Sequence, residues 1–322
     1  MTAIALLVQP GATPSSVTAT LDMFDIANRF LGGAVCRVEV FSAAGGTVRL
    51  SGAASVDTQG LPACLEGFDA VIVPGFFAAD PDTLSRELRT TWQPVTAALR
   101  RLGDTFPIVA ASCHGTFVLA ESGLLDGHRA TTAWWFQRVF AERYPQVQLL
   151  ADRALVDDGA FVTAGAMTAH TELSMQVLRR LHGAALARSV ASIMLVDGVR
   201  TSQQPFVMPQ RSFADPLAQQ AGAWLAENLS AEFSAAALAA ACHASYRTLH
   251  RRFSAAAGMP PLEYLQQLRV ERAKSLLENS RMSLDGIVSE VGYTDVSSFR
   301  RLFLRLAGLS PAQYRRRFQR GG

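Results

Sequence analysis

The carboxyl-terminal third of the chain contains an internal repeat at an offset of 50 residues. Residues 241–253 read ACHASYRTLHRRF, and residues 291–303 read VGYTDVSSFRRLF. Both copies therefore carry a pair of apolar residues four positions apart, Leu249 and Phe253 in one and Phe299 and Phe303 in the other. Residues with this spacing lie on one face of a helix. Each copy predicts a short helix, a tight turn and a second helix that buries the apolar pair.

The two copies stay alike beyond the second helix. Gly258 and Gly308 follow at matching positions, and Pro261 and Pro311 come three residues later. Glycine is favoured just past the end of a helix, and proline is favoured at the first position of the next one. We expect about seven helices in this region. One of them, residues 261–278, is long enough to act as a rigid spacer between the two copies.

The face opposite each apolar pair is expected to point outward. Six side chains share that face in the two copies: Arg247, His250, Arg251, Ser297, Arg300 and Arg301. Arginine can form two hydrogen bonds with guanine in the major groove, and Ser and His can contact bases or phosphates. Two such helices held roughly 34 Å apart can enter successive major grooves on one face of the duplex. The repeat therefore favours two helix-turn-helix units that bind double-stranded DNA through these six residues.

The charge of the chain is divided unevenly. From Asp215 onward there are 14 Lys and Arg against 9 Asp and Glu, whereas residues 1–214 hold 16 against 18. A basic excess in one third of the chain favours an acidic partner for that third. The alternative interpretation of the repeat is a plain helical bundle whose basic faces contact only solvent.

The first part of the chain has a different pattern, and a length of 322 residues suits two domains. Short runs rich in Val and Ile alternate with segments of helical periodicity. The strand-like runs are residues 4–8, 36–41, 70–73 and 108–111, and the helical segments are residues 16–30, 82–102 and 116–122. This alternation predicts an α/β domain of the flavodoxin-like kind, with a mostly parallel sheet between two layers of helices.

Residues 201–214, which read TSQQPFVMPQRSFA, contain two prolines, three glutamines and no helical period. We interpret them as a linker between a sensor domain at residues 1–200 and a DNA-binding domain at residues 215–322. No apolar run approaches the roughly 18 residues needed to cross a bilayer. The four cysteines are scattered without the spacing of a metal site. We therefore expect a cytoplasmic protein with no metal, no cofactor and no membrane contact.

The most informative motif of the first domain is residues 108–120, IVAASCHGTFVLA. It predicts a strand that ends near Ser112, a sharp bend at Cys113 and a helix from Thr116, with Gly115 permitting the close turn. This arrangement holds a nucleophile at the amino terminus of a helix. We expect the helix dipole to lower the pKa of the thiol and to favour an anion or a carbonyl oxygen beside it.

The helical repeat resembles the AraC/XylS DNA-binding domain from about residue 217 to residue 318. The resemblance covers both copies and the helix that joins them. It implies that the base-contacting positions of that family fall on the same six outward residues.

Residues 3–185 resemble the PfpI-like branch of the class I glutamine amidotransferase-like fold. The resemblance is carried by FDAVIVPG at residues 68–75, by the segment around Cys113 and by residues 123–132. The fusion of this fold to AraC-type units is similar to the GlxA-type regulators. In the wider fold the cysteine at this bend is a nucleophile that works with an acidic residue and a nearby histidine.

The resemblance makes Cys113 and His114 the candidate catalytic residues, but two positions depart from the family pattern. Ser16 stands where an acidic residue is usual, and Ala133 stands where related regulators often carry His. A cysteine without these partners lacks the groups that nucleophilic catalysis requires. We therefore expect a ligand-sensing domain that is not a working hydrolase.

Ligands of open α/β sheets bind outside the carboxyl ends of the strands. The expected walls of such a pocket are Ser16, Gly75, Phe76, Cys113, His114 and Trp134. The partners we expect are promoter or operator DNA, an unidentified small-molecule effector, a second copy of the chain in a homodimer, and RNA polymerase. Two alternatives stay open: a cysteine-dependent amidase or peptidase with an appended DNA-binding module, and a redox sensor that acts through oxidation of Cys113. A further alternative is that Cys113 is buried and inert.

Overall fold

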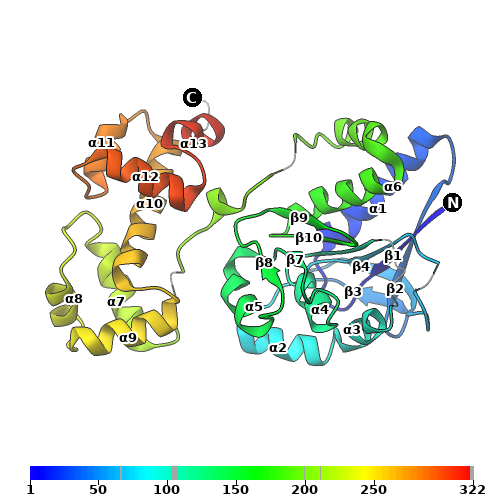
Figure 1. Cartoon of the computed structure of the whole chain (residues 1–322), viewed down its shortest axis with the longest axis horizontal. Helices are drawn as coiled ribbons and strands as arrows, with labels where there is room; N and C mark the ends of the chain where they lie inside the picture. Colours follow the sequence, from blue (N-terminus) through cyan, green and yellow to red (C-terminus); the bar gives the residue numbers. More distant parts are fainter. Residues whose placement is uncertain (66, 103–107, 199, 211, 320–322) are drawn as a thin grey trace. The chain divides into compact units, whose positions relative to one another are not determined.

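The chain divides into two compact units, Met1–Gln203 and Gln204–Gly322 (Figure 1). The structure is a computed structural model, and it describes residues 1–65, 67–102, 108–198, 200–210 and 212–319. The segment that we expected to be a linker, residues 201–214, is shared between the units. Its first three residues belong to the first unit and the others to the second.

The first unit is built on an eight-stranded sheet of order β3-β4-β2-β1-β5-β6-β10-β9. The neighbouring pairs from β4 to β10 are parallel, and the two edge strands, β3 and β9, are antiparallel to their neighbours. The strands are β1 (Thr2–Leu7), β2 (Cys36–Ser42), β3 (Gly46–Arg49), β4 (Ser55–Gly60), β5 (Ala70–Val73), β6 (Val109–Ser112), β9 (Leu155–Asp158) and β10 (Phe161–Ala164). A separate small pair is formed by β7 (Arg129–Ala130) and β8 (Gln148–Leu149). The flavodoxin-like, mostly parallel sheet that the sequence predicted is confirmed.

Helices cover both faces of this sheet (Figure 1). On one face α1 (Pro14–Leu31) packs beside α6 (Ala169–Ile193), whose path is broken at Gly183. The other face is covered by α2 (Pro81–Arg89), α3 (Gln93–Arg100), α4 (Gly115–Glu121) and α5 (Gln137–Arg143). The central strands are buried on both faces, which explains why they read as continuous apolar runs in the sequence.

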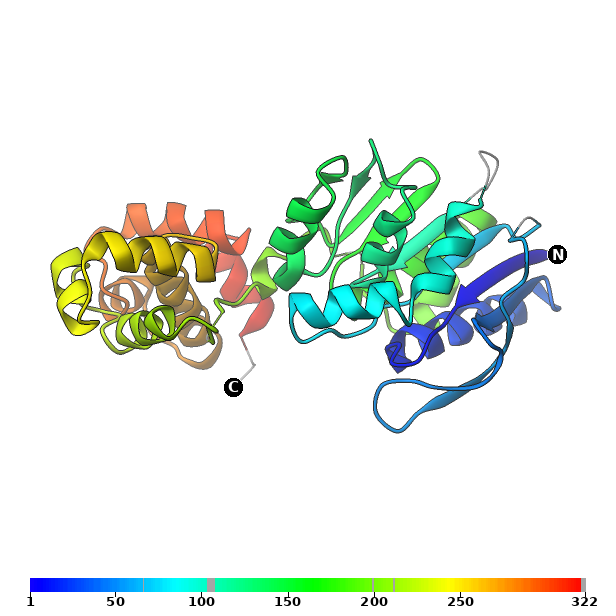
Figure 2. The same ribbon diagram turned by 90° about the horizontal axis from the view of Figure 1, so that it is seen from below.

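The four strand-like runs correspond to β1, β2, β5 and β6, with ends that differ by at most two residues. The helical pattern of residues 82–102 is not continuous, because α2 ends at Arg89 and α3 begins at Gln93. Pro94 accounts for the break, since it has no N–H to donate and an uninterrupted helix would lose a bond there. The sequence analysis also gave no prediction for the hairpin of β3 and β4, which extends from the sheet (Figure 2).

The described part of the second unit contains seven α-helices, as the sequence predicted. They are α7 (Pro216–Glu227), α8 (Ala235–Ala241), α9 (Tyr246–Ala257), α10 (Pro261–Asn279), α11 (Leu284–Glu290), α12 (Val296–Ala307) and α13 (Pro311–Phe318). The long helix α10 lies between two groups of helices, α7 to α9 and α11 to α13 (Figure 1). Each group has its own hydrophobic core, and α10 contributes side chains to both cores.

Residues 204–210 and 212–213 of the second unit, which we call the strap, pack on its helices. The Phe213 ring lies in the first of the two cores, 5.4 Å from the ring of Phe253 and 5.6 Å from that of Tyr264. The Tyr264 hydroxyl donates a hydrogen bond to the carbonyl oxygen of Gln210 at 2.7 Å. The carboxyl-terminal end of the strap is therefore part of the core of the DNA-binding unit.

The amino-terminal half of the strap contacts the second group of helices. The buried Lys274 of α10 donates from Nζ to the carbonyl oxygen of Val207 at 3.0 Å. Burial lowers the pKa of Lys274 below its ordinary value. The Phe206 ring lies edge-on to the Phe318 ring of α13, 5.6 Å between centroids. The strap thus contacts both halves of this unit.

Gln203, the last residue of the first unit, is buried and held by several hydrogen bonds. Its Nε2 donates to the carbonyl oxygens of Thr132 at 3.0 Å and Arg153 at 2.9 Å, and its Oε1 accepts from the amide of Ala166 at 3.2 Å. Such a set of bonds satisfies a buried amide side chain. These hydrogen bonds therefore fix the position of the last residue of the first unit.

Candidate functional site

The first helix-turn-helix unit consists of α8, residues 242–245 and α9. The Ser245 hydroxyl caps α9 by accepting a hydrogen bond from the amide of Thr248. Leu249 and Phe253 of α9 are fully buried, as the repeat predicted. The helix ends at Gly258, whose φ of 73° is the left-handed conformation that glycine adopts at low energy.

The second unit consists of α11, residues 291–295 and α12. Asp295 caps α12, and Phe299 and Phe303 are fully buried. The turn is one residue longer than in the first unit. The ungapped repeat aligns Gly292 with Cys242. Because of the extra residue, Gly292 instead corresponds in conformation to His243 of the first turn, and both residues are left-handed. A Cβ at Gly292 would lie 2.4 Å from the carbonyl oxygen of Ser230, so only glycine fits there.

The six outward residues of the two second helices lie on the surface of the unit. Five of them are exposed: Arg247, Arg251, Ser297, Arg300 and Arg301. His250 is half-buried, and its ring lies 5.7 Å from that of Tyr246. The Arg301 guanidinium donates to the Ser298 hydroxyl at 2.9 Å. The structure therefore brings all six side chains to accessible positions on α9 and α12.

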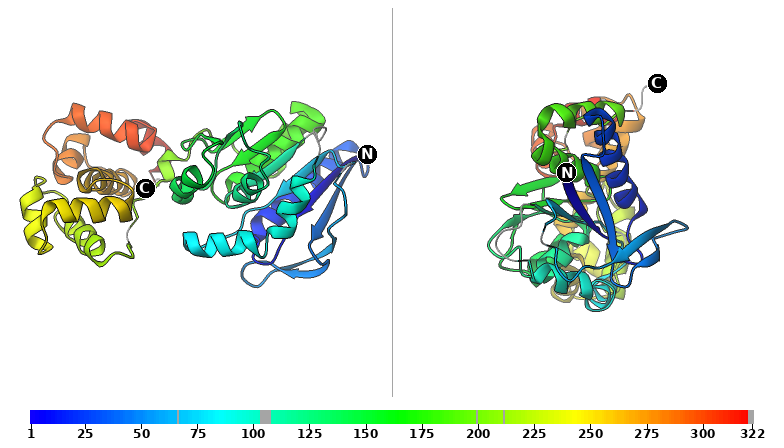
Figure 3. Two further views of the ribbon diagram at one scale, coloured as in Figure 1. Left: turned by 60° about the horizontal axis from the view of Figure 1, so that its bottom comes forward. Right: turned by 90° about the vertical axis from the view of Figure 1, so that its right-hand side faces the viewer.

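Helices α9 and α12 flank α10 and run in similar directions (Figure 1 and Figure 3). The 19 residues of α10 span about 28 Å at ~1.5 Å per residue. This length is comparable with the roughly 34 Å of one turn of DNA. Arg252, also on α9, has a different role, because it forms two hydrogen bonds with Asp215, both at 2.9 Å. It connects α9 to the start of α7.

The bend between β6 and α4 has the predicted strand–cysteine–helix geometry. Cys113 has a φ of 53°, a strained value for a residue with a side chain. Its amide donates to the carbonyl oxygens of Ala164 and Gly165. A Cβ at Gly115 would lie 2.6 Å from the carbonyl oxygen of Pro74. Gly115 is thus required by the close approach of α4 to the end of β5, and its φ is not positive.

The thiol of Cys113 is buried, with Sγ 3.9 Å from the carbonyl oxygen of Phe76. Burial raises its pKa to about 12. The expectation of a lowered thiol pKa was wrong, because loss of hydration opposes the charged form more strongly than the helix terminus favours it. The thiol is therefore neutral at physiological pH.

His114 is fully buried among aromatic rings and is also neutral. Burial lowers its pKa to about 4. Its Nδ1 accepts a hydrogen bond from the amide of Ala78 at 3.2 Å, and the nearest of the surrounding ring centroids, that of Phe136, lies at 4.6 Å. Among the described residues, Nε2 has no hydrogen-bond partner. With Nδ1 committed to Ala78, the imidazole does not act as a base toward the adjacent thiol.

A buried network that the sequence analysis missed lies behind the bend. His170 of α6 bonds to the Ser112 hydroxyl through Nδ1 and to the Thr20 hydroxyl through Nε2, each at 2.8 Å. Burial lowers the pKa of His170 to about 4. Ser16 is buried on the first turn of α1, and among the described residues its hydroxyl has no partner. The bonds of His170 join α6 to α1 and to the end of β6.

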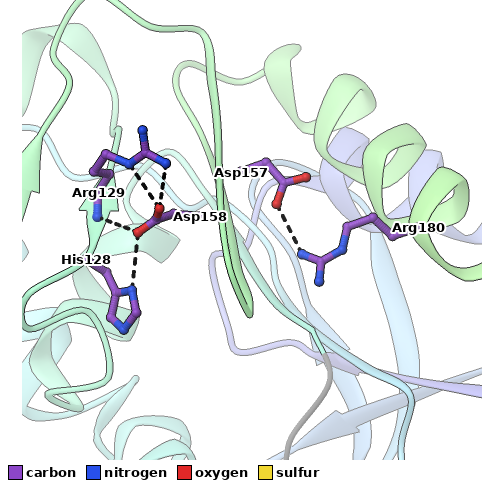
Figure 4. A network of polar contacts seen from close by, with 5 residues as sticks. All are labelled: His128, Arg129, Asp157, Asp158 and Arg180. Atoms are coloured by element: carbon purple, nitrogen blue, oxygen red, sulfur yellow. Dashed lines mark hydrogen bonds and ion pairs between the residues drawn. The ribbon is translucent and has the colours of Figure 1, made fainter.

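The carbonyl of Cys113 accepts a hydrogen bond from the Thr132 hydroxyl at 2.8 Å. Thr132 follows β7, and Figure 4 shows how β7 is fixed to β9. Asp158 accepts hydrogen bonds from the amide of Arg129 at 2.9 Å and from its guanidinium at 2.8 Å and 3.0 Å. These bonds, together with one from His128, lower the pKa of the Asp158 carboxyl to about 2.

The expected pocket residues are only partly brought together. Gly75, Phe76, Cys113 and His114 are packed against one another, and a Cβ at Gly75 would lie 3.0 Å from the Cβ of Cys113. Trp134 instead packs against Trp135. These side chains pack into the space beside Cys113. The ligand site that we expected at this place therefore stays a prediction. Three cavities of this unit lie elsewhere: one of about 820 Å³ along α6, one of about 500 Å³ beside Gln9 and one of about 360 Å³ between Arg100 and Arg143.

We expect iodoacetamide to alkylate Cys113 far more slowly than the exposed Cys64. With a pKa of about 12, only about one Cys113 thiol in ten thousand is ionised at pH 8. A raised pKa also means that the rate increases as the pH rises. Mass spectrometry of digested protein after timed alkylation measures both rates, and the Cys64→Ser variant is the control. Equal rates at the two cysteines at pH 7.5 would contradict the buried, neutral thiol.

No helix within the described ranges is both long enough and apolar enough to span a bilayer. Two arginine-bearing helix-turn-helix units joined to a three-layer α/β domain define the class of AraC-type, DNA-binding transcriptional regulators. Comparisons with known proteins agree. Residues 2–180 match the DJ-1/PfpI family, and residues 238–317 match a helix-turn-helix domain. The chain belongs to the DJ-1/PfpI family.

Its relatives share both parts. The HTH-type transcriptional regulator GbdR of Pseudomonas aeruginosa is 25% identical over 97% of this chain and 83% of its own length. The regulator GlxA of Rhizobium meliloti is 26% identical over 97% of this chain and 94% of its own. Among solved structures, DJ-1beta of Drosophila melanogaster matches with a TM-score of 0.52 and 20% identity, covering 61% of this chain and 99% of that one. This last likeness shows the fold of the first unit.

Proposed function

We propose that this protein regulates transcription by binding an operator through α9 and α12 and by sensing a small molecule with its first unit. The observation that carries the proposal is the pair of matching helices whose exposed faces present Arg247, Arg251, Ser297, Arg300 and Arg301. His250 completes the set from a half-buried position. The contacts with bases give specificity, and those with phosphates give most of the affinity.

We propose further that the first unit is not an enzyme. The DJ-1/PfpI fold includes enzymes, but here the thiol of Cys113 and the imidazole of His114 are both neutral and buried. A cysteine nucleophile needs a thiolate and an oriented base. The burial of Cys113 also disfavours the redox-sensor alternative, because oxidation proceeds through an accessible thiolate.

We propose that the protein works as a cytoplasmic homodimer and that it contacts RNA polymerase when bound to DNA. The exposed apolar side chains at the end of α6 support a dimer. Leu195 is 89% exposed and Ile193 is 61% exposed, beside the cavity that runs along this helix. Effector binding changes DNA affinity to the extent that one arrangement of the protein binds the effector better than another.

Footprinting of the full-length protein on a binding site selected from random DNA tests the proposal. The expected result is two protected patches on one face of the duplex, centred about one helical turn apart. A single protected patch would show that only one of the two helix-turn-helix units contacts the DNA. No protection at any salt concentration would overturn the assignment of DNA binding.

A further inference from the structure

Gln203, the last residue of the first unit, is connected to the bend at Cys113 by two short paths of hydrogen bonds. Its Nε2 donates to the carbonyl oxygen of Thr132, and its Oε1 accepts from the amide of Ala166. The Thr132 hydroxyl donates to the carbonyl oxygen of Cys113 at 2.8 Å, and the amide of Cys113 donates to the carbonyl oxygen of Gly165 at 2.9 Å. A Cβ at Gly165 would overlap the Gln203 amide. The two segments that hold the bend therefore also hold the Gln203 side chain.

The chain that leads to Gln203 is also bound to the first unit. The Arg200 guanidinium forms an ion pair, with two hydrogen bonds, to the buried carboxylate of Glu172 on α6. A two-bond pair of this kind fixes the geometry of both groups. Ser202 pairs with Arg153 in an antiparallel β-bridge. The residues that precede the junction of the two units therefore move with the first unit.

The residue after the junction, Gln204, belongs to the strap and lies at the end of α12. A Cβ at Gly308, which ends α12, would be 3.2 Å from the Cβ of Gln204. The other end of the strap packs on α9, where the Phe213 ring is 5.4 Å from that of Phe253. Between these ends, side chains of α10 donate hydrogen bonds to two carbonyl oxygens of the strap. The strap therefore contacts both arginine-bearing helices and the long helix between them.

We propose that Gln203 couples the bend at Cys113 to the DNA-contacting helices, so that operator binding and the arrangement of the bend alter each other. This proposal rests on the regulatory function proposed above. One peptide bond joins residue 203, which is bound beside the bend, to residue 204 of the strap. Energetic coupling between sites passes through bonded and packed elements of this kind. It is reciprocal, so an occupant that alters the bend changes DNA affinity by the factor by which DNA changes the affinity for that occupant.

Hydrogen–deuterium exchange of the full-length protein, with and without the selected operator, tests the proposal. The amide of Cys113 is bonded within the bend, and that of Ala166 is bonded to Gln203, so both report on this region. Operator binding fixes α9 and α12 and with them the strap. We therefore expect saturating operator to slow exchange in the peptides that contain these two amides by about threefold or more. Unchanged exchange in both peptides, with the DNA protected in footprinting, would overturn the proposal.

A matched pair of variants tests the role of Gln203. Gln203→Glu keeps the shape of the side chain but replaces the donor Nε2 with an oxygen that repels the carbonyl oxygens of Thr132 and Arg153. It is expected to retain DNA protection and to lose the effect of the operator on exchange. Asn28→Asp is the control, because Asn28 makes the same two kinds of bond with the backbone of Cys36, at the amino end of β2. It is expected to keep the effect, and an undiminished effect in Gln203→Glu would contradict the coupling role.

A third variant tests the junction and leaves every contact described above in place. Insertion of Gly-Ser-Gly-Ser between residues 203 and 204 makes the connection flexible. We expect this variant to protect the operator and to show no effect of the operator on exchange around the bend. It decides the question even if Gln203→Glu unfolds the first unit. The full effect in the insertion variant would show that coupling does not pass through the junction.

Footprinting of the same preparations separates this proposal from the regulatory function. DNA protection without any change of exchange excludes the coupling alone. Absent protection by the unaltered protein would contradict DNA binding itself, whatever the exchange experiment shows.

Discussion

Arg301→Ala is expected to lower affinity for the selected operator by ~1–3 kcal/mol, about 5- to 150-fold, and to relax the preference for one base pair. The side chain is exposed on the outward face of α12. Its guanidinium can form two hydrogen bonds with a guanine, and the methyl group of alanine can form neither of them. Fluorescence anisotropy at one fixed salt concentration, with the selected operator and with each single-base variant of it, measures the effect.

The control for this substitution is Arg272→Ala. Arg272 is also exposed in the same unit, but it lies on α10 and forms an ion pair with Glu290 at 3.6 Å. It should leave the operator affinity within a factor of about two, because surface ion pairs contribute little. If Arg301→Ala weakens binding to random DNA as much as binding to the operator, Arg301 contacts phosphate and does not read a base.

Phe303→Ala is expected to lower the free energy of unfolding of the second unit by about 3–5 kcal/mol. The Phe303 ring is fully buried in the core around α12, 5.9 Å from the ring of Phe299 and 5.6 Å from that of Tyr314. Its removal leaves a cavity that the surrounding helices cannot fill. Because the first unit has a separate core, its own transition should keep its midpoint. Differential scanning calorimetry of the full-length protein separates the two transitions.

The neighbouring residue on the same helix provides a matched control. Leu304 is 51% exposed, so Leu304→Ala should change the stability by less than about 0.5 kcal/mol. A similar loss from both variants would show that the outward face of α12 is covered. That result would also remove the support for a DNA-contacting role of this face.

Most details of the second unit could be predicted from the sequence because its repeat shows the same local sequence signals in two copies. Helix caps, glycine ends and apolar pairs each act within a few residues, and two copies make chance agreement improbable. The one local error was the length of the second turn. The close approach of Ser230 to Gly292, which leaves no room for a Cβ there, joins residues distant in the sequence and is not visible in the repeat.

The position of Cys113 at a sharp bend could also be predicted, but its chemistry could not. Whether a thiol is ionised depends on how much water reaches it, and here the aromatic rings of Phe76 and Phe136 close the space around Cys113 and His114. These rings come from separate segments of the chain. No spacing of residues shows that they meet, so the sequence indicated the nucleophile and gave the wrong direction for its pKa.

The anchoring of Gln203 and of the strap was missed for a related reason. Residues 201–214 have no helical period, so their pattern indicated a linker. The hydrogen bond between Gln203 and Thr132 joins residues that are 71 positions apart in the sequence. Long-range pairing of this kind leaves little trace in a single sequence.

The contacts of the strap determine where the chain can be divided into fragments without loss of stabilising groups. A fragment that starts at Asp215 retains every α-helix of the second unit, but it omits the Phe213 ring and the carbonyl groups that pair with Lys274 and Tyr264. A fragment or a chimaeric regulator joined between residues 203 and 204 keeps these groups with the helices they stabilise. For regulators of this architecture, the boundary for exchanging sensor domains therefore lies before the proline-containing segment.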